Sequence, residues 1–166
     1  VDGDGRMELI AVQADGNIDD RYVPHQITCV TVYRLTGEMM WQKGTCQEKA
    51  GGFGSDFPAQ VYDIDGDGKQ EILCVMDQTF LVLDGTDGSV KQSHPLPDPE
   101  AHDCIILADL SGKGRPTDVI LKDRYRRMWA FDEDWNLLWT HEGNVGHFPW
   151  AYDINGDWYD EVMAGY

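Results

Sequence analysis

Basic residues are scarce in this chain. Lys and Arg together number 13, against 30 Asp and Glu, and the formal net charge is −17. A field of that sign repels polyanions, so nucleic acid and anionic membrane surfaces are poor partners. An acidic polysaccharide would also be repelled unless bound cations neutralised much of the charge. The charge balance therefore points to metal ions.

Several other features are missing. No apolar run approaches the roughly 18 residues that a membrane span needs, so no membrane span is expected in this piece. No stretch keeps a helical period. The sequence has no nucleophile elbow, phosphate-binding glycine loop or zinc-ligand spacing, which excludes the commonest signatures of hydrolases, nucleotide-binding proteins and zinc proteins.

The four cysteines lack C-x-x-C spacing. Cys74 and Cys104 lie inside apolar runs, where buried thiols are the plain interpretation. A disulfide between Cys29 and Cys46 would need an oxidising compartment, and spacing alone leaves it open.

One pattern is present four times: VDGDGRMELIAV from Val1, YDIDGDGKQEILCV from Tyr62, ADLSGKGRPTDVIL from Ala108 and YDINGDWYDEVMAG from Tyr152. The first Asp of the motif falls at positions 63, 109 and 153, which are 46 and 44 residues apart. Periods in the mid-forties are typical of a four-stranded propeller blade. The first interval is longer, and the polar, turn-rich residues 13–25 are the expected insertion.

Each repeat predicts the same order of strands. An apolar run precedes the Asp/Gly loop, a second run follows it as a hairpin, and a third and fourth follow after short turns. We expect strands at residues 27–35, 39–42, 59–62, 71–76, 79–83, 90–94, 104–108, 118–121, 127–131, 137–141, 150–152 and 161–164.

The fold class that follows is all-β: a β-propeller of four-stranded antiparallel blades with Asp/Gly calcium loops. Residues 1–166 form a single partial propeller of about three blades, divided into a blade remnant at 1–50, blades at 51–96 and 97–142, and a blade start at 143–166. The chain begins inside a motif and would leave sheet edges open. We therefore expect the remaining blades of the same propeller in a longer protein.

The second loop has the donors of a calcium site. Asp63, Asp65, Asp67 and Glu71 stand at positions 1, 3, 5 and 9, and the backbone carbonyl of Lys69 stands at position 7. Oxygen ligands at such spacing can surround one hard cation, and four carboxylates so close would otherwise repel one another. An EF-hand is excluded, because flanking helices and a Glu at position 12 are missing.

The scheme recurs with small changes. The first loop offers Asp2, Asp4, the carbonyl of Arg6, and Glu8, while the fourth offers Asp153, Asn155, Asp157, the carbonyl of Tyr159, and Glu161. The third loop differs, with Asp109, Ser111, Lys113 and a displaced Asp118. We predict that the ammonium of Lys113 takes the place of a cation there.

These loops resemble the FG-GAP-type repeat of integrin-like propellers, in which D-x-D-G-D-G-x-x-E/D links the first two strands of a blade. The stretches VYRLTGEMMWQKG, QVYDIDGDGKQEI, HDCIILADL and GHFPWAYDINGD also resemble bacterial rhamnogalacturonan lyases of the calcium-binding propeller type. The resemblance implies Ca²⁺ as cofactor and a carbohydrate-active protein. Because weak calcium modules suit high external calcium, we expect an extracellular, cell-surface or periplasmic location.

Chemistry is expected on the face opposite the calcium loops. A lyase that cleaves uronate-containing, pectin-like chains by β-elimination needs a base and a cationic clamp. The candidate base is His102 or His147, the clamp is Lys122 or Arg124, and Tyr125 or Trp150 is the platform on which a sugar ring would stack. Candidate substrate-binding residues are Asp56, Asp103 and Trp150. Each also has a plain structural interpretation as a loop hydrogen bond, a solvated turn or core between blades.

Two functions follow. The first is a secreted polysaccharide lyase. The alternative is a non-catalytic FG-GAP propeller that binds glycans or proteins at the cell surface. The expected partner is an acidic polysaccharide or another glycan, with no nucleic acid.

Overall fold

The computed structural model describes residues 1–16, 21–46 and 57–165. These residues form thirteen β-strands, all in antiparallel sheets, and no helix. The prediction of an all-β fold is confirmed for this part of the chain. It follows that none of the described segments is a helix with the length and hydrophobicity to cross a membrane. The chain divides into two compact units, Val1–Pro95 and Leu96–Tyr166.

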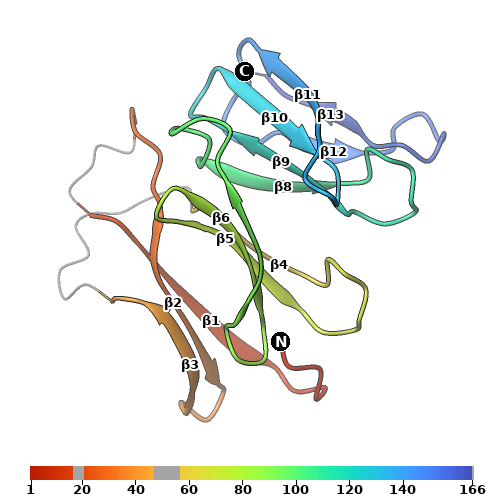
Figure 1. Ribbon diagram of the computed structural model, residues 1–166. Coiled ribbons are helices and arrows are strands. Elements are labelled where there is room, and N and C mark those ends of the chain that lie inside the picture. Colours follow the sequence, from red (N-terminus) through yellow and green to blue (C-terminus); the bar gives the residue numbers. More distant parts are fainter. Residues whose placement is uncertain (17–20, 47–56, 166) are drawn as a thin grey trace. The chain divides into compact units, whose positions relative to one another are not determined.

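The first unit holds two antiparallel sheets (Figure 1). A three-stranded sheet has the order β1 (Glu8–Ala14), β2 (Ile27–Arg34) and β3 (Met39–Gly44). A four-stranded sheet has the order β4 (Ala59–Tyr62), β5 (Glu71–Met76), β6 (Thr79–Asp84) and β7 (Val90–Pro95). In both sheets the strands follow chain order, as in a meander.

The second unit repeats this arrangement. Its four-stranded sheet contains β8 (Cys104–Ala108), β9 (Asp118–Lys122), β10 (Arg127–Phe131) and β11 (Leu137–Glu142), again in chain order. Its two-stranded sheet contains β12 (Trp150–Tyr152) and β13 (Glu161–Met163). In every sheet with a complete motif, the Asp/Gly loop joins the first two strands, as the repeat predicts.

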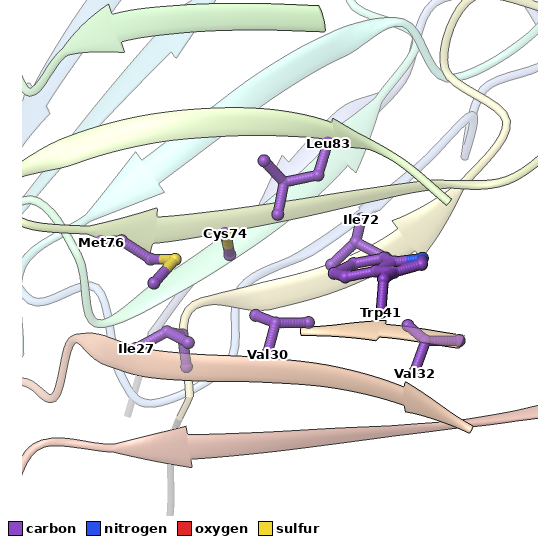
Figure 2. Packing of buried hydrophobic residues seen from close by; sticks show 8 residues of the cluster. All are labelled: Ile27, Val30, Val32, Trp41, Ile72, Cys74, Met76 and Leu83. Atoms are coloured by element: carbon purple, nitrogen blue, oxygen red, sulfur yellow. The ribbon is translucent and has the colours of Figure 1, made fainter. Parts of the chain in front are cut away.

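The core of the first unit lies between its two sheets (Figure 2). Trp41 is the largest side chain in this cluster, and its indole N–H donates to the carbonyl of Gly85 at 2.8 Å. Gly88 has φ +73°, and a Cβ there would lie 2.6 Å from the Trp41 ring, so the turn before β7 needs glycine. The buried members are Ile27, Val30, Val32, Trp41, Ile72, Cys74, Met76 and Leu83.

The core of the second unit also lies where its two sheets pack together. Inward positions of the four-stranded sheet supply small and medium side chains, and half-buried residues of β12 and β13 pack against them. Its buried members are Ala108, Ile120, Met128, Ala130 and Val145. The second strand of each four-stranded sheet, β5 or β9, is buried along its whole length, whereas the last strands, β7 and β11, are mostly exposed.

The predicted strands agree closely with the observed ones. β4, β5, β8, β10 and β12 have the expected bounds, the other predicted strands differ by one or two residues at an end, and β1 had no predicted bounds. The sheets are those of a propeller-like fragment, while the number of blades and their boundaries stay predictions. Part of the predicted insertion at 13–25, namely residues 17–20, and part of the boundary near residue 51 lie outside the described residues.

Candidate metal sites

The Asp/Gly loops share one backbone frame. The first Asp accepts hydrogen bonds from backbone N–H groups three to five residues later: Asp63 accepts from Gly66 at 2.7 Å and from Gly68 at 3.0 Å. Asp153 does the same with Gly156 at 2.6 Å and Trp158 at 3.0 Å. Each loop is thus wound tightly around its first carboxylate, and this turn positions the later acidic side chains.

A second set of contacts recurs at the later positions. The carboxylate at position 3 accepts from the N–H at position 5, and position 5 accepts from position 7. For example, Asp4 N–H donates to Asp2 at 3.1 Å, and Arg6 N–H donates to Asp4 at 2.8 Å. Lys69 and Tyr159 donate in the same way, to Asp67 at 2.8 Å and to Asp157 at 3.0 Å.

In the second loop, carboxylate oxygens of Asp63, Asp65 and Glu71 all lie within 4.8 Å of one another. Glu71 opens β5 and is 1% exposed. One of its oxygens accepts from the N–H of Ile64 at 3.0 Å, which turns the other toward the loop interior. The three residues together form a compact oxygen site of the kind that calcium prefers.

A lysine from outside the motif reaches into this site. Lys91 on β7 places its ammonium 2.5 Å from Asp65, 2.9 Å from Glu71 and 3.8 Å from Asp67. The hydrogen bond to Asp65, followed by that to Glu71, raises the pKa of Lys91 well above its ordinary value. The ammonium is therefore a positive charge held among the same carboxylates that would hold a metal ion.

The first loop gathers Asp2, Asp4 and Glu8, whose carboxylate oxygens also lie within 4.8 Å of one another. The backbone N–H of Asp4, and then the Arg34 guanidinium, hold the pKa of Asp2 below its usual range. Arg34 lies 3.4 Å from Asp2 and 3.5 Å from Asp4, near the rim of the cluster.

Glu8 is the residue that best tests the fit to a cation. Its side chain is 1% exposed, and one oxygen contacts the amino group of Val1. The other oxygen, Oε1, is buried and has no hydrogen-bond partner among the described residues. A buried carboxylate oxygen without a partner is costly, and a hard cation bound to Asp2, Asp4 and Glu8 would satisfy it. The donors of the first loop therefore fit calcium.

The two loops of the first unit lie against each other. The N–H of Gln70 donates to the carbonyl of Val1 at 3.2 Å, and a Cβ on Gly3 would lie 3.2 Å from Lys69. The two candidate cation sites of this unit are thus neighbours on one rim, as expected if successive motif loops lie on the same face.

The fourth loop has the same frame with an amide in place of one carboxylate. The side-chain NH₂ of Asn155 donates to Asp157 at 3.1 Å and to Glu161 at 2.6 Å. The amide thereby bridges two of the predicted ligands, and the N–H of Ile154 donates to Glu161 at 2.8 Å. For a cation to bind between Asn155, Asp157 and Glu161, the side-chain amide of Asn155 would have to rotate so that its oxygen faces the cation in place of its NH₂ group.

The third loop is closed by its own side chains. Asp118 accepts from both the hydroxyl and the N–H of Ser111, at 3.0 and 2.8 Å, and Asp109 accepts from the N–H of Lys113 at 2.7 Å and that of Gly114 at 2.6 Å. The ammonium of Lys113 pairs with Glu133. Its pKa is raised first by the hydrogen bond to Glu133 and, more weakly, by the charge of Asp118, so the replacement of a cation by Lys113 stays a prediction.

The residues expected to do chemistry form a different kind of cluster. Asp103, at the start of the four-stranded sheet of the second unit, pairs with Lys122 and, at 2.6 Å, with Arg124. Lys122 also donates to the carbonyl of Arg124 at 3.0 Å. Lys122 and Asp103 are both 0% exposed, and Arg124 is buried. The three side chains form one buried ion-pair network, in which Asp103 contacts both cations. None of the three presents its charge at the surface.

Tyr125 and His147 are brought together. The Tyr125 hydroxyl lies 3.4 Å from Nε2 of His147, and the two rings meet edge to face at 5.1 Å. They line an open cavity of about 740 Å³, together with Arg126, Asn144 and Phe148. The second candidate histidine, His102, is buried instead.

The remaining substrate-binding candidates differ in placement. Trp150 is 66% exposed on β12, and Asp56 lies outside the described residues. Neither is part of the triad of Asp103, Lys122 and Arg124.

Sequence reasoning missed the two cations that face the loops, Arg34 and Lys91. Neither belongs to the motif: Arg34 ends β2 and Lys91 lies on β7, so pairing across strands is what brings them to the acidic residues. The alternation of inward and outward side chains on these strands could have suggested this, but only once the register was known.

A comparison with protein-family models matches residues 1–74 to the FG-GAP-like repeat. That match includes both candidate sites of the first unit, and this part of the chain is therefore similar to FG-GAP-like repeats. It supports the FG-GAP part of the expected resemblance and not the lyase part. A comparison with curated proteins found no match.

A comparison with solved structures gives two partial likenesses. The biofilm matrix protein Bap1 of V. cholerae has a TM-score of 0.57 and 21% sequence identity, over 96% of this chain and 28% of that one. BamB from Moraxella catarrhalis has a TM-score of 0.40 and 14% identity, over 82% of this chain and 38% of that one. The chain thus spans less than two fifths of either structure, and the first likeness supports the propeller-like fold.

Proposed function

We propose that this chain is a calcium-stabilised, propeller-like module of an extracellular or cell-surface protein, and that it binds or scaffolds rather than catalyses. Calcium staples the Asp/Gly hairpins of the first unit and offsets part of the negative charge. The ligand surface would belong to the module as a whole, with a glycan or another protein as the partner.

The observation that carries this proposal is the buried, unpartnered oxygen of Glu8. It lies in the three-carboxylate cluster of Asp2, Asp4 and Glu8, and the second loop gathers three carboxylates of its own, Asp63, Asp65 and Glu71. Bound calcium would supply positive charge that these carboxylates share, with Arg6 and Lys69 adding backbone carbonyls. Loops of this kind suit the millimolar calcium found outside cells.

One further observation favours binding over catalysis, and another favours an extracellular setting. The two cations expected to stabilise an enolate, Lys122 and Arg124, are buried against Asp103 and are taken up by that pairing. In addition, the fold is shared with a biofilm matrix protein, which supports an extracellular setting.

Calorimetric titration of the chain with calcium tests the proposal. Two binding events are expected for the first unit, the one in the first loop lost in Glu8→Gln and the one in the second loop lost in Glu71→Gln. Because these substitutions remove one charge with little change of shape, far-UV circular dichroism should stay that of a β-protein.

Asp132→Asn is the matched control, since Asp132 caps the turn between β10 and β11 and lies in neither cluster. Calcium binding that is absent in the wild type, or that survives in the Glu8→Gln and Glu71→Gln double variant, would overturn the calcium assignment.

A lyase acting by β-elimination on uronate-containing pectin-like chains, such as rhamnogalacturonan, is the second proposal. It has one observation in its favour: Tyr125 and His147 face each other at an open cavity. The test is the ultraviolet absorbance of unsaturated uronate, with the wild type and His147→Ala compared in calcium buffer. A signal that is absent, or unchanged in His147→Ala, would exclude this pair as the acid and base.

A further inference from the structure

Two of the four cysteines come together in the first unit. Cys29 lies on β2, paired in register with Gly44 of β3, and Cys46 follows two residues after that partner. The ladder continues past the strand end, because the N–H of Thr45 donates to the carbonyl of Thr28 at 2.9 Å.

A shared partner shows that the two sulfur atoms converge. The Thr31 hydroxyl lies 3.6 Å from Sγ of Cys29 and 4.0 Å from Sγ of Cys46. Burial, and after it the neighbouring Cys46 thiol, raises the pKa of Cys29. Cys46 is exposed and Cys29 is buried. One sulfur is therefore open to an oxidant, and the other lies directly behind it.

We propose that Cys29 and Cys46 form a disulfide when the protein meets an oxidising compartment, and that this bond ties the end of β3 to β2. The pair is distinct from the other cysteines. Cys74 is buried in the core between the sheets, and burial raises the pKa of its thiol to about 12. Cys104 is also buried, in the second unit.

The chemistry is thiol–disulfide exchange, with a low-molecular-weight disulfide as the oxidant. The exposed Cys46 thiolate attacks one sulfur of that disulfide, forms a mixed disulfide and releases one thiolate. The Cys29 thiolate then attacks Sγ of Cys46 and releases the second. The two cysteines lose two protons and two electrons, and the oxidant is reduced to two thiols.

Exposure fixes the order of these steps. Burial raises the pKa of Cys29, so its thiol is the poorer first nucleophile and the second attack is the slower one. The product closes the loop from residue 29 to residue 46, which restricts the unfolded chain and stabilises the sheet.

The test uses the 166-residue chain, reduced, freed of reductant and incubated with oxidised glutathione. The sample is then denatured and labelled with a maleimide, and its intact mass and peptides are measured. We expect two of the four thiols to escape labelling, and a peptide map should join Cys29 to Cys46. The thermal midpoint of the oxidised chain should exceed that of the reduced chain.

Three variants keep the result interpretable. Cys74→Ser is the matched control and should still lose two thiols, provided that it folds. Cys46→Ser should lose none and should show no oxidation-dependent change in its thermal midpoint, and Cys29→Ala should stop at a glutathione adduct on Cys46. Four labelled thiols in the oxidised wild type would overturn the proposal. A permanent Cys46 adduct, or a bond that uses Cys74 or Cys104, would overturn it as well.

Discussion

At the scale of single residues, two cations outside the repeated motif distinguish the candidate sites. Lys91 has its ammonium among the carboxylates of the second loop, at 2.5 to 3.8 Å from three of them. Arg34 lies at 3.4 and 3.5 Å from two carboxylates of the first loop, so it contacts the cluster more weakly. The two sites therefore differ in how strongly an internal cation competes with calcium.

Lys91→Met should tighten calcium binding at the second loop. The ammonium must leave Asp65 and Glu71 before a metal ion can use their oxygens, and removing it removes that competition. Because 1.4 kcal/mol corresponds to a tenfold change, we expect roughly a tenfold lower dissociation constant. Calorimetric titration of the two proteins at one salt concentration measures it.

The control is Lys113→Met, which removes a lysine that pairs with Glu133 outside any carboxylate cluster of the first unit. It should leave the calcium affinity of the second loop unchanged. An affinity in Lys91→Met that equals or falls below the wild-type value would mean that Lys91 does not compete with the ion.

Asp103→Asn should destabilise the second unit by about 3–5 kcal/mol. The substitution leaves the buried charges of Lys122 and Arg124 without their carboxylate, and a buried charge without a partner is costly. Urea unfolding followed by tryptophan fluorescence measures the change. Arg126→Met is the control, since its exposed guanidinium lies 3.9 Å from Glu100 and should contribute at most about 1 kcal/mol. A change below 1 kcal/mol in Asp103→Asn would contradict the structural role of the triad.

At the scale of elements, the Asp/Gly loops share one backbone conformation, but their acidic side chains are stabilised in two different ways. The first and second loops gather three carboxylates each, and Glu8 retains an oxygen without a partner. The third loop satisfies Asp118 through the hydroxyl and the N–H of Ser111. The same hairpin connection is thus compatible with a metal ion in one repeat and with a serine hydroxyl in another.

Ser111→Ala should destabilise the chain by about 1 kcal/mol, equally in calcium and in chelator. The substitution removes the hydroxyl donor to Asp118 and touches no candidate calcium ligand. Denaturant unfolding in the two buffers measures this difference, and Glu71→Gln provides the comparison because its cost should be larger in calcium than in chelator, where only its ion pair with Lys91 is weakened. A cost of Ser111→Ala that depended on calcium would mean that the third loop also binds the ion.

The strands and the loop frame were predictable because both depend on local pattern. Short apolar runs on either side of an Asp/Gly turn predict a hairpin, and the repeat period predicts how often it recurs, so strands such as β4 and β8 have the expected bounds. Which groups the charged side chains of a loop contact depends on partners far away in the sequence. Lys113 illustrates this: its position in the motif suggested a cation substitute, and the motif did not show that Glu133, twenty residues later, would hold its ammonium.

The expected catalytic cluster shows the same limit. Lys122 and Arg124 were predicted as the clamp and Asp103 as a substrate-binding residue on one face, and the structure pairs the three with one another. Sequence alone did not show that they would be buried together, because burial depends on how β9 packs in its sheet. A charged residue at a strand end has the same sequence signature whether it contacts solvent or an internal partner.

At the scale of the whole molecule, the excess of acidic residues makes stability depend on bound cations and on salt. The formal net charge is −17, and a compact chain with that charge repels itself. Each calcium ion adds two positive charges at the carboxylate clusters of the first unit. Calcium should therefore act through two effects, direct ligation and relief of repulsion, which salt can separate.

Chelation with EGTA should lower the thermal midpoint, and added calcium should restore it. A single site occupied at a hundred times its dissociation constant stabilises by about 2.7 kcal/mol, and two such sites by about twice that amount. Raising sodium chloride to about 1 M in EGTA should recover only part of the loss, because salt screens the repulsion but supplies no ligand for Glu8.

Magnesium should restore less than calcium, since it dehydrates reluctantly and demands octahedral geometry. Differential scanning fluorimetry in the four buffers measures all of these midpoints. If sodium chloride alone restored the full midpoint, the carboxylate clusters would act only as net charge, and the proposed calcium staples would be excluded.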